Sequence, residues 1–131
     1  MNNVTLSPRT ALVIDDNHIL LDALYEALED AGFDTTAVDR GSPAMTMLAE
    51  RCFDVLVVDI NLPDMNGLSI CELARKQYQD QVAILVITGL KIERRGLASL
   101  QVCADDFLGK PFDIDELIAR IESKLRRASK N

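Results

Sequence analysis

Five polar or charged residues of this chain stand at the ends of strand-like apolar runs: Asp15, Asp16, Asp59, Thr88 and Lys110. If the strands are parallel, these residues gather at one edge of one sheet, which is where open α/β sheets bind ligands. Two unit charges about 4 Å apart repel by roughly 4 kcal/mol at an effective dielectric of about 20. Three carboxylates at that edge are therefore unfavourable without a cation, and the cluster indicates a divalent-cation and phosphoryl site.

The candidate ligands are all oxygen donors. The single histidine, His18, and three widely spaced cysteines provide no zinc constellation. Oxygen donors favour Mg²⁺, for which Mn²⁺ can substitute. The alternative is that the acids cap helices, which suits Asp16 or Asn17 before the first helical segment. Capping does not explain Asp59, which a loop follows, so we favour the metal interpretation.

A carboxylate beside Mg²⁺ can also attack phosphorus and form an aspartyl phosphate. This reaction needs a cation that balances the phosphoryl charge, and Lys110 is placed to supply it. It also benefits from a hydroxyl, which Thr88 offers. Taken singly, a threonine at a strand end and a lysine on the surface are ordinary residues. Their joint placement favours the functional interpretation.

Apolar runs alternate with helical patterns along the chain, which indicates a parallel sheet with crossover helices. We expect strands at 11–14, 33–38, 54–58, 82–87 and 105–108. The second should lie at an edge, and the third, apolar on both faces, should be central.

The helices should occupy 20–31, 42–50, 68–77, 91–101 and 114–127. Gly32 is a C-cap signal for the first, and Ser42 followed by Pro43 marks the start of the second, with Ser42 as the N-cap. Gly96, near the middle of the fourth, costs about 1 kcal/mol relative to alanine. We expect that helix to rearrange most easily.

Composition limits the remaining function classes. The chain has 131 residues, enough for one domain with its own core, and a net charge of −7, so as a unit it lacks the basic surface of a nucleic-acid binder. The basic C-terminal residues complement a helix dipole. No signal peptide or apolar run long enough to span a membrane is visible. We expect a cytoplasmic protein with reduced, largely buried cysteines.

Four motifs resemble those of one protein family. They are V-I-D-D-N at 13–17, V-V-D-I-N-L-P-D-M-N-G at 57–67, V-I-T-G at 86–89 and A-D-D-F-L-G-K-P-F at 104–112. Over essentially its whole length the chain resembles the receiver domain of two-component response regulators. The resemblance implies a flavodoxin-like (βα)5 doubly wound sheet of strand order 2-1-3-4-5. The receiver would occupy residues 10–128, with tails at 1–9 and 129–131, the second of which could begin a linker.

The resemblance also implies roles for the site residues. Asp59 would accept a phosphoryl group from the phosphohistidine of a sensor histidine kinase or phosphotransfer protein. Asp16, Asp59 and the backbone carbonyl of Asn61 would bind Mg²⁺, with Asp15 acting through water. The protein would be a signalling switch that catalyses only its own phosphorylation and autodephosphorylation.

In the family, the lysine at the position of Lys110 pairs with the phosphoryl group and precedes a cis proline, here Pro111. Thr88 and Phe107 would be the switch residues, and Phe107 replaces the commoner tyrosine. Gly89 stands where alanine is common, so the mouth of the site should be more open. Cys103 stands where glycine is usual, and a left-handed backbone there would be strained.

The switch would change the surface made by the fourth helix, the fifth strand and the last helix. The last helix resembles that of regulators with a winged-helix DNA-binding domain, whose receivers form homodimers through this surface with positions like Asp105 and Arg120. A single-domain regulator that binds a partner directly remains an alternative.

Three other classes share parts of this pattern. A dinucleotide-binding enzyme needs a glycine-rich turn where this chain has 15–17, Asp-Asp-Asn. A haloacid-dehalogenase-like phosphatase needs a second carboxylate where Asn61 stands, and a cap domain. The more serious alternative is a receiver-like interaction module that works without phosphorylation. Such a module has no need to retain the repelling acids.

Overall fold

The computed structural model describes residues 8–89, 98 and 103–129. Its centre is a parallel five-stranded sheet in the order β2-β1-β3-β4-β5. The strands are β1 (Thr10–Ile14), β2 (Asp34–Val38), β3 (Val55–Asp59), β4 (Ala83–Thr88) and β5 (Asp106–Gly109). The expected fold class and strand order are confirmed, with β2 at one edge and β3 in the centre.

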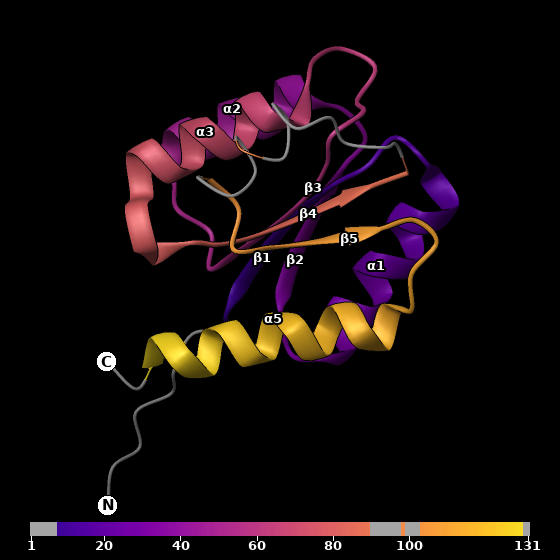
Figure 1. The fold of residues 1–131 in the computed structure, drawn as a ribbon, viewed down its shortest axis with the longest axis vertical. Helices are drawn as coiled ribbons and strands as arrows, with labels where there is room; N and C mark the ends of the chain where they lie inside the picture. Colours follow the sequence, from indigo (N-terminus) through magenta and orange to yellow (C-terminus); the bar gives the residue numbers. More distant parts are fainter. Residues whose placement is uncertain (1–7, 90–97, 99–102, 130–131) are drawn as a thin grey trace, which may run out of the picture.

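The helices cover both faces of the sheet (Figure 1). They are α1 (His18–Asp30), α2 (Gly41–Glu50), α3 (Gly67–Tyr78) and α5 (Ile114–Ser129), with a short 3-10 helix η1 (Gln79–Gln81) after α3. In Figure 1, α2 and α3 lie on one face, and α1 and α5 lie on the other. The helix expected at 91–101 falls almost wholly outside the described residues. None of the described helices is long and apolar enough to cross a membrane.

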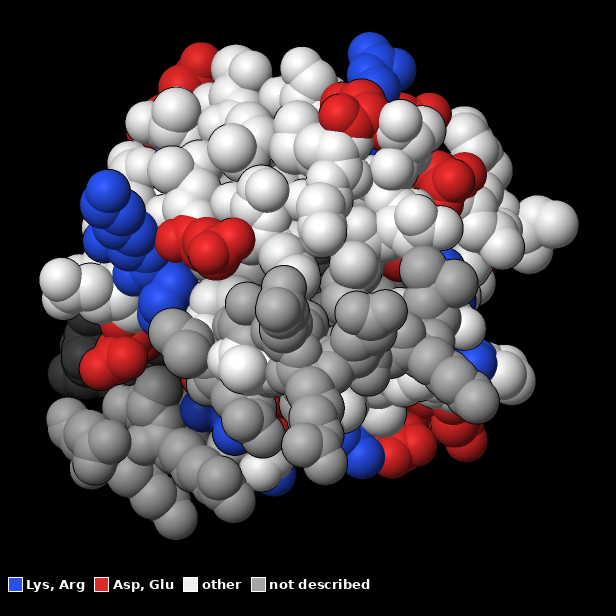
Figure 2. All heavy atoms as spheres, turned by 45° about the horizontal axis from the view of Figure 1, so that its top comes forward, with Lys and Arg blue, Asp and Glu red and all other residues white. Residues whose placement is uncertain are grey.

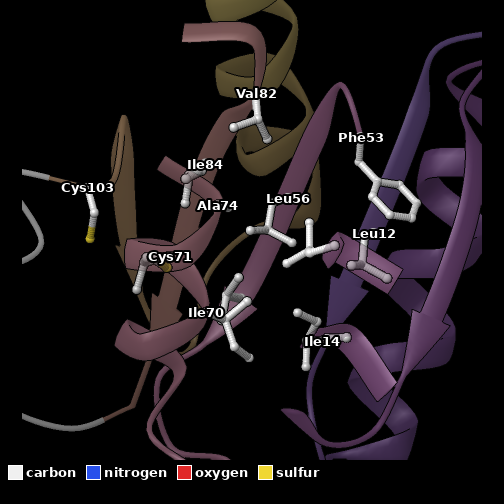
Figure 3. Packing of buried hydrophobic residues seen from close by; sticks show 14 of the residues in the cluster. Leu12, Ile14, Phe53, Leu56, Ile70, Cys71, Ala74, Val82, Ile84 and Cys103 are labelled. Carbon is white, nitrogen blue, oxygen red and sulfur yellow. The ribbon is translucent and has the colours of Figure 1, made fainter. Parts of the chain in front are cut away.

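Alternation along the strands divides the core into two layers. In β1, Leu12 and Ile14 face the cluster under α2 and α3, whereas Ala11 and Val13 face the cluster under α1 and α5. The first cluster, shown in Figure 3, also includes Phe53, which is fully buried. Because successive strand residues point to opposite faces, an apolar run is required in every central strand. The apolar side chains on both faces therefore fix the position of the central strands, and the polar residues that follow them lie at the edge of the sheet.

The two ends of α1 are formed by local signals. The Asn17 side chain accepts hydrogen bonds from the amides of Ile19 at 3.1 Å and Leu20 at 3.2 Å, so Asn17, rather than Asp16, is the N-cap. Gly32 follows the C-cap with a φ of 96°, as its sequence position predicted. Capping therefore uses Asn17 and leaves the Asp16 carboxylate available for another role.

The expectation that Ser42 caps α2 is wrong. The helix begins at Gly41, and Arg40 at the N-cap makes no side-chain hydrogen bond to it. Instead, the carboxylate of Asp64, from the loop after β3, accepts hydrogen bonds from the backbone amides of Gly41 at 2.7 Å and Ser42 at 2.8 Å. Pro43 does lie in the first turn, as expected. A residue remote in sequence thus satisfies amides that lack a local acceptor.

This remote cap predicts a pH-dependent stability. Hydrogen bonds from the Gly41 and Ser42 amides hold the pKa of Asp64 below its ordinary value of 3.8. The stabilisation is therefore fully present above that ordinary value and is lost as the pH falls below it, through the lower pKa of the folded state. Asp64→Ala should lower the urea midpoint at neutral pH, and the difference from the wild type should shrink below about pH 4.

Asp80→Asn is the matched control, because it removes one exposed acidic charge that makes no cap. Its urea midpoint should stay near that of the wild type. Equal midpoints for Asp64→Ala and Asp80→Asn at neutral pH would contradict the capping role.

Candidate functional site

Two acidic side chains meet at the carboxyl edge of the sheet. Asp15 follows β1, Asp59 is the last residue of β3, and these strands are neighbours. Both residues are buried, with exposed fractions of 0% and 3%, whereas Asp16 is exposed. One carboxylate oxygen from each of the three acids lies within 4.8 Å of the others. The structure therefore brings together the three acids that the sequence pattern predicted.

Lys110 faces both buried acids. Its ammonium donates a hydrogen bond to Asp59 Oδ2 at 2.8 Å and lies 3.0 Å from Asp15 Oδ2. The second contact is an ion pair without hydrogen-bond geometry, so Asp15 Oδ2 has no hydrogen-bond partner among the described residues. The Lys110 backbone amide donates to the Thr88 carbonyl at 2.7 Å, and the bond to Pro111 is cis, as expected.

Each buried carboxylate uses one oxygen locally and presents the other to the site. Asp15 Oδ1 accepts a hydrogen bond from the backbone amide of Asn17 at 2.8 Å, and Asp59 Oδ1 accepts one from the backbone amide of Asn61 at 3.0 Å. These bonds orient the side chains so that the two Oδ2 atoms converge on Lys110. The site is thus built by turns immediately after the strands.

The surroundings of the site raise the pKa of Asp15 and of Lys110. Burial raises the pKa of Asp15, and the nearby Asp59 charge raises it further. Burial also opposes the charge on Lys110, but its contacts with Asp59 and Asp15 outweigh that effect and raise the pKa of Lys110. One ammonium thus contacts two acids, and Asp16 adds a third carboxylate within 4.8 Å of them, so another cation would relieve the remaining repulsion.

The residues present fit a hard divalent cation. The donors are carboxylates, and the buried Asp15 Oδ2 lacks a hydrogen-bond donor. An open hollow reaches the acids and is lined by Asp16, Asn17, Asp59, Asn61, Gly89 and Lys110. Oxygen ligands beside an open hollow suit Mg²⁺, which keeps several water ligands.

The comparisons with known proteins now decide the family. The model of the response regulator receiver domain matches residues 11–122. The chain belongs to this family. It is 36% identical to the transcriptional regulatory protein GltR of Pseudomonas aeruginosa, over 92% of this chain and 50% of GltR. The chain spans about half the length of the curated relatives it matches.

Solved receiver structures share the fold. A CheY-like receiver domain protein from Methanospirillum hungatei superimposes with a TM-score of 0.87 and 27% identity, over 95% of this chain and 98% of that one. The response regulator TrrA of Thermotoga maritima, solved with Mg²⁺ and beryllofluoride, gives a TM-score of 0.78 and 27% identity. That match covers 88% of this chain and 98% of TrrA.

The two expected switch residues of this receiver lie on adjacent strands. Thr88 ends β4 and is buried, and it pairs in register with Gly109 of β5. Phe107 of β5 pairs with Val86 and is 42% exposed. The ring thus points at least partly outward in this structure. Their movement stays a prediction.

The departures from the family pattern have small structural effects. A methyl group added at Gly89 would lie 3.7 Å from Lys110 Cβ, in ordinary contact, so glycine leaves the mouth of the hollow slightly wider. Cys103 is not left-handed, because Gln79 is the one non-glycine residue with positive φ in the described chain. The strain considered for Cys103 therefore does not arise.

Asp105, for which the resemblance implied a dimer contact, makes hydrogen bonds within one chain in this structure, and the dimer contact stays a prediction. Its Oδ2 accepts hydrogen bonds from Arg75 Nη2 and from the Ile84 amide, both at 2.7 Å. Arg120 instead binds Asp106 and Glu116, each at 2.9 Å. Asp105 thus ties α3 and β4 to β5 within one chain.

The sequence pattern did not single out Gly67, the first residue of α3. A Cβ built there would lie 2.2 Å from the Asp59 carbonyl oxygen and 2.8 Å from Ile60 Cα. The Gly67 amide donates to the Ile60 carbonyl at 2.7 Å, so α3 begins directly against the strand that carries Asp59. The Asn66-Gly67 pair is a turn signal that could have indicated a close backbone approach. The backbone that Gly67 approaches, at Asp59 and Ile60, could not be identified from the neighbouring sequence.

Substitution of Gly67 should therefore disturb both stability and the site. Alanine normally stabilises a helix relative to glycine, but here its methyl group meets backbone that must shift. We expect Gly67→Ala to lower the free energy of unfolding by about 1–3 kcal/mol, the usual cost of overpacking. Urea unfolding monitored by circular dichroism measures this change.

Gly89→Ala is the matched control, because its added methyl group finds space 3.7 Å from Lys110. It should leave the free energy of unfolding nearly unchanged. A Gly67→Ala protein as stable as Gly89→Ala would contradict the close approach at Asp59.

Proposed function

We propose that this receiver accepts a phosphoryl group on Asp59 from the phosphohistidine of a sensor histidine kinase or phosphotransfer protein. The observation that carries the proposal is the convergence of Asp15 Oδ2 and Asp59 Oδ2 on Lys110 beside an open hollow. This arrangement retains strong repulsion between acids, which a purely structural edge has no reason to keep.

Asp59 is the nucleophile in this proposal. One of its carboxylate oxygens forms the new bond to phosphorus, the bond from phosphorus to the donor histidine nitrogen breaks, and the leaving imidazole retains that electron pair. The hydrogen bond from the Asn61 amide orients the carboxylate while it reacts. The Lys110 ammonium, 2.8 Å from Asp59, is placed to transfer its contact to a phosphoryl oxygen.

Asp16, Asp59 and the carbonyl of Asn61 would hold Mg²⁺, with Asp15 acting through a water molecule. The bound ion supplies positive charge that stabilises the phosphoryl oxygens during transfer. The mutual proximity of the three acids supports this assignment, as does the buried Asp15 Oδ2, which has an ion pair with Lys110 but no hydrogen bond among the described residues. Mn²⁺, another hard cation, should replace Mg²⁺.

Phosphorylation would reach the surface through the two switch residues. It adds about −1.5 to −2 charge beside the end of β4. Thr88 would move its hydroxyl towards the phosphoryl group, and the half-exposed Phe107 ring would turn inward into the vacated space. The surface formed by β5 and α5 would then favour a second conformation; the fourth helix of the expected switch surface lies outside the described residues.

The output of this switch would be transcriptional regulation. The relative GltR is a transcriptional regulatory protein about twice the matched length, which supports an output domain attached to this receiver. Phosphorylation would favour a homodimer through the β5 and α5 surface, where Arg120 and Asp106 already form an ion pair 2.9 Å long. A kinase donor would place the protein in the cytoplasm.

The surface charge is consistent with protein partners. Figure 2 shows one face of the molecule, where neutral side chains predominate and acidic and basic ones lie interspersed, several of them side by side. Because its net charge is −7, we expect this chain itself not to bind nucleic acid, which is negatively charged. A receiver-like module that ignores phosphate is the alternative, and the retained site makes it the weaker one.

Acetyl phosphate with Mg²⁺ tests the acceptor directly. The intact mass of the wild type should increase by about 80 Da, one phosphoryl group, and Asp59→Asn should show no increase. Removal of Mg²⁺ with a chelator should abolish the gain. An equal gain in Asp59→Asn would refute Asp59 as the acceptor.

Beryllofluoride tests the switch and covers the case of a receiver that uses only its kinase. Added with Mg²⁺, it should shift amide signals in 103–112 by nuclear magnetic resonance, as well as those beside Asp59. Shifts confined to the immediate neighbours of Asp59 would contradict the switch. No response to either reagent would favour the phosphate-independent module.

A further inference from the structure

The loop between β3 and α3 carries a peptide segment on which the acceptor site depends. The loop follows Asp59 directly, and the backbone amide of Asn61 donates to Asp59 Oδ1 at 3.0 Å. The carbonyl of the same residue is a proposed ligand of Mg²⁺, and Asn61 lines the open hollow. The place of Asn61 therefore decides how Asp59 is presented to a cation or to a phosphoryl group.

Asp64 fastens this loop to α2 with both of its carboxylate oxygens. Oδ1 accepts a hydrogen bond from the Gly41 amide at 2.7 Å, and Oδ2 accepts one from the Ser42 amide at 2.8 Å. The Met65 side chain lies against Gly41, where an added Cβ would overlap it. Two consecutive loop residues thus contact the first turn of α2.

The helix is a firmer support than the loop. Ala44 and Leu48 of α2 are fully buried in the core between α2, α3 and the sheet (Figure 1). In the loop, Leu62 is buried, whereas Asn61 and Asp64 are exposed. The bonds from Asp64 therefore tie an exposed stretch of loop to a helix that the core holds in place.

Capping of α2 by itself does not require this arrangement. A serine, threonine, aspartate or asparagine just before the helix would satisfy its first amides locally. Arg40 stands there instead and makes no side-chain hydrogen bond to the helix. The acceptor comes from the loop that follows Asp59, so the cap of α2 and the place of the loop depend on each other.

We propose that Asp64 is a positioning residue for the acceptor site. It holds the loop against α2, and the Asn61 backbone thereby stays where its amide orients Asp59 and its carbonyl can meet a cation. The inference rests on the proposed phosphoryl acceptance at Asp59. Asp64 acts through Asn61 and not on the reacting atoms. Loss of a group that orients a metal ligand typically costs about 10- to 100-fold in metal affinity or activity.

Hydrogen exchange of two backbone amides tests the positioning without a metal or a phosphoryl donor. Asn17 donates to Asp15 at 2.8 Å as Asn61 does to Asp59 at 3.0 Å, but Asn17 lies before α1, outside this loop. In Asp64→Ala, nuclear magnetic resonance should show the Asn61 amide exchanging at least about threefold faster, and the Asn17 amide unchanged. Asp64→Asn, which keeps one acceptor oxygen, should lie between Asp64→Ala and the wild type.

Metal binding and phosphorylation give the functional readout. Asp64→Ala should bind Mg²⁺ about 10-fold more weakly than the wild type and should gain its phosphoryl group from acetyl phosphate more slowly. Leu48→Ala is the control for stability, because it opens a cavity under the second half of α2, away from the bonds to Asp64. Where circular dichroism shows all the proteins folded, Leu48→Ala should keep the Mg²⁺ affinity and the rate of the wild type.

The outcomes separate this inference from the proposed function. Equal exchange of the Asn61 amide in Asp64→Ala and the wild type would overturn the positioning role, as would an equal loss of Mg²⁺ affinity in Leu48→Ala. If the wild type gains no phosphoryl group but Asp64→Ala still speeds Asn61 exchange, the proposed function fails and the positioning role stands. If both proteins are phosphorylated at the same rate, the positioning role alone fails.

Discussion

The repulsion between buried carboxylates at one sheet edge is the constraint on which this structure turns. Asp15 and Asp59 stand side by side because β1 and β3 are neighbours, and the apolar faces of those strands fix their position. Only one ammonium, that of Lys110, faces both among the described residues. The hydrophobic core thus holds together acids whose mutual repulsion a bound cation would relieve.

The connections around that region are mainly backbone contacts. The amide of Lys110 binds the carbonyl of Thr88, and the amides of Asn17 and Asn61 hold the acids. Changes at the site therefore act first on strand ends and the turns after them. Because β4 and β5 pair directly, a change near Thr88 has a short route to Phe107.

The family resemblance implied the strand order, whereas the sequence pattern itself predicted the parallel sheet and the residues that meet at its edge. The reason is that apolar runs and the polar residues after them encode strand direction and position directly. The pattern failed at Ser42, because Asp64 supplies the cap from another loop. It also missed Gly67, whose need for space depends on the Asp59 backbone. These features depend on contacts between remote segments, which no local period records.

The loop between β3 and α3 illustrates how such contacts limit variation in length. Its ends are joined by the bond from Gly67 to Ile60 and by a bridge between Asn61 and Asn66, and Asp64 fastens its middle to α2. Surface loops ordinarily accept inserted residues. Here an inserted residue would break the contacts that join the two ends of the loop, or those between Asp64 and the start of α2. It would also displace the Asn61 backbone amide that orients Asp59. This exposed loop is therefore expected to keep its length as strictly as a core strand does.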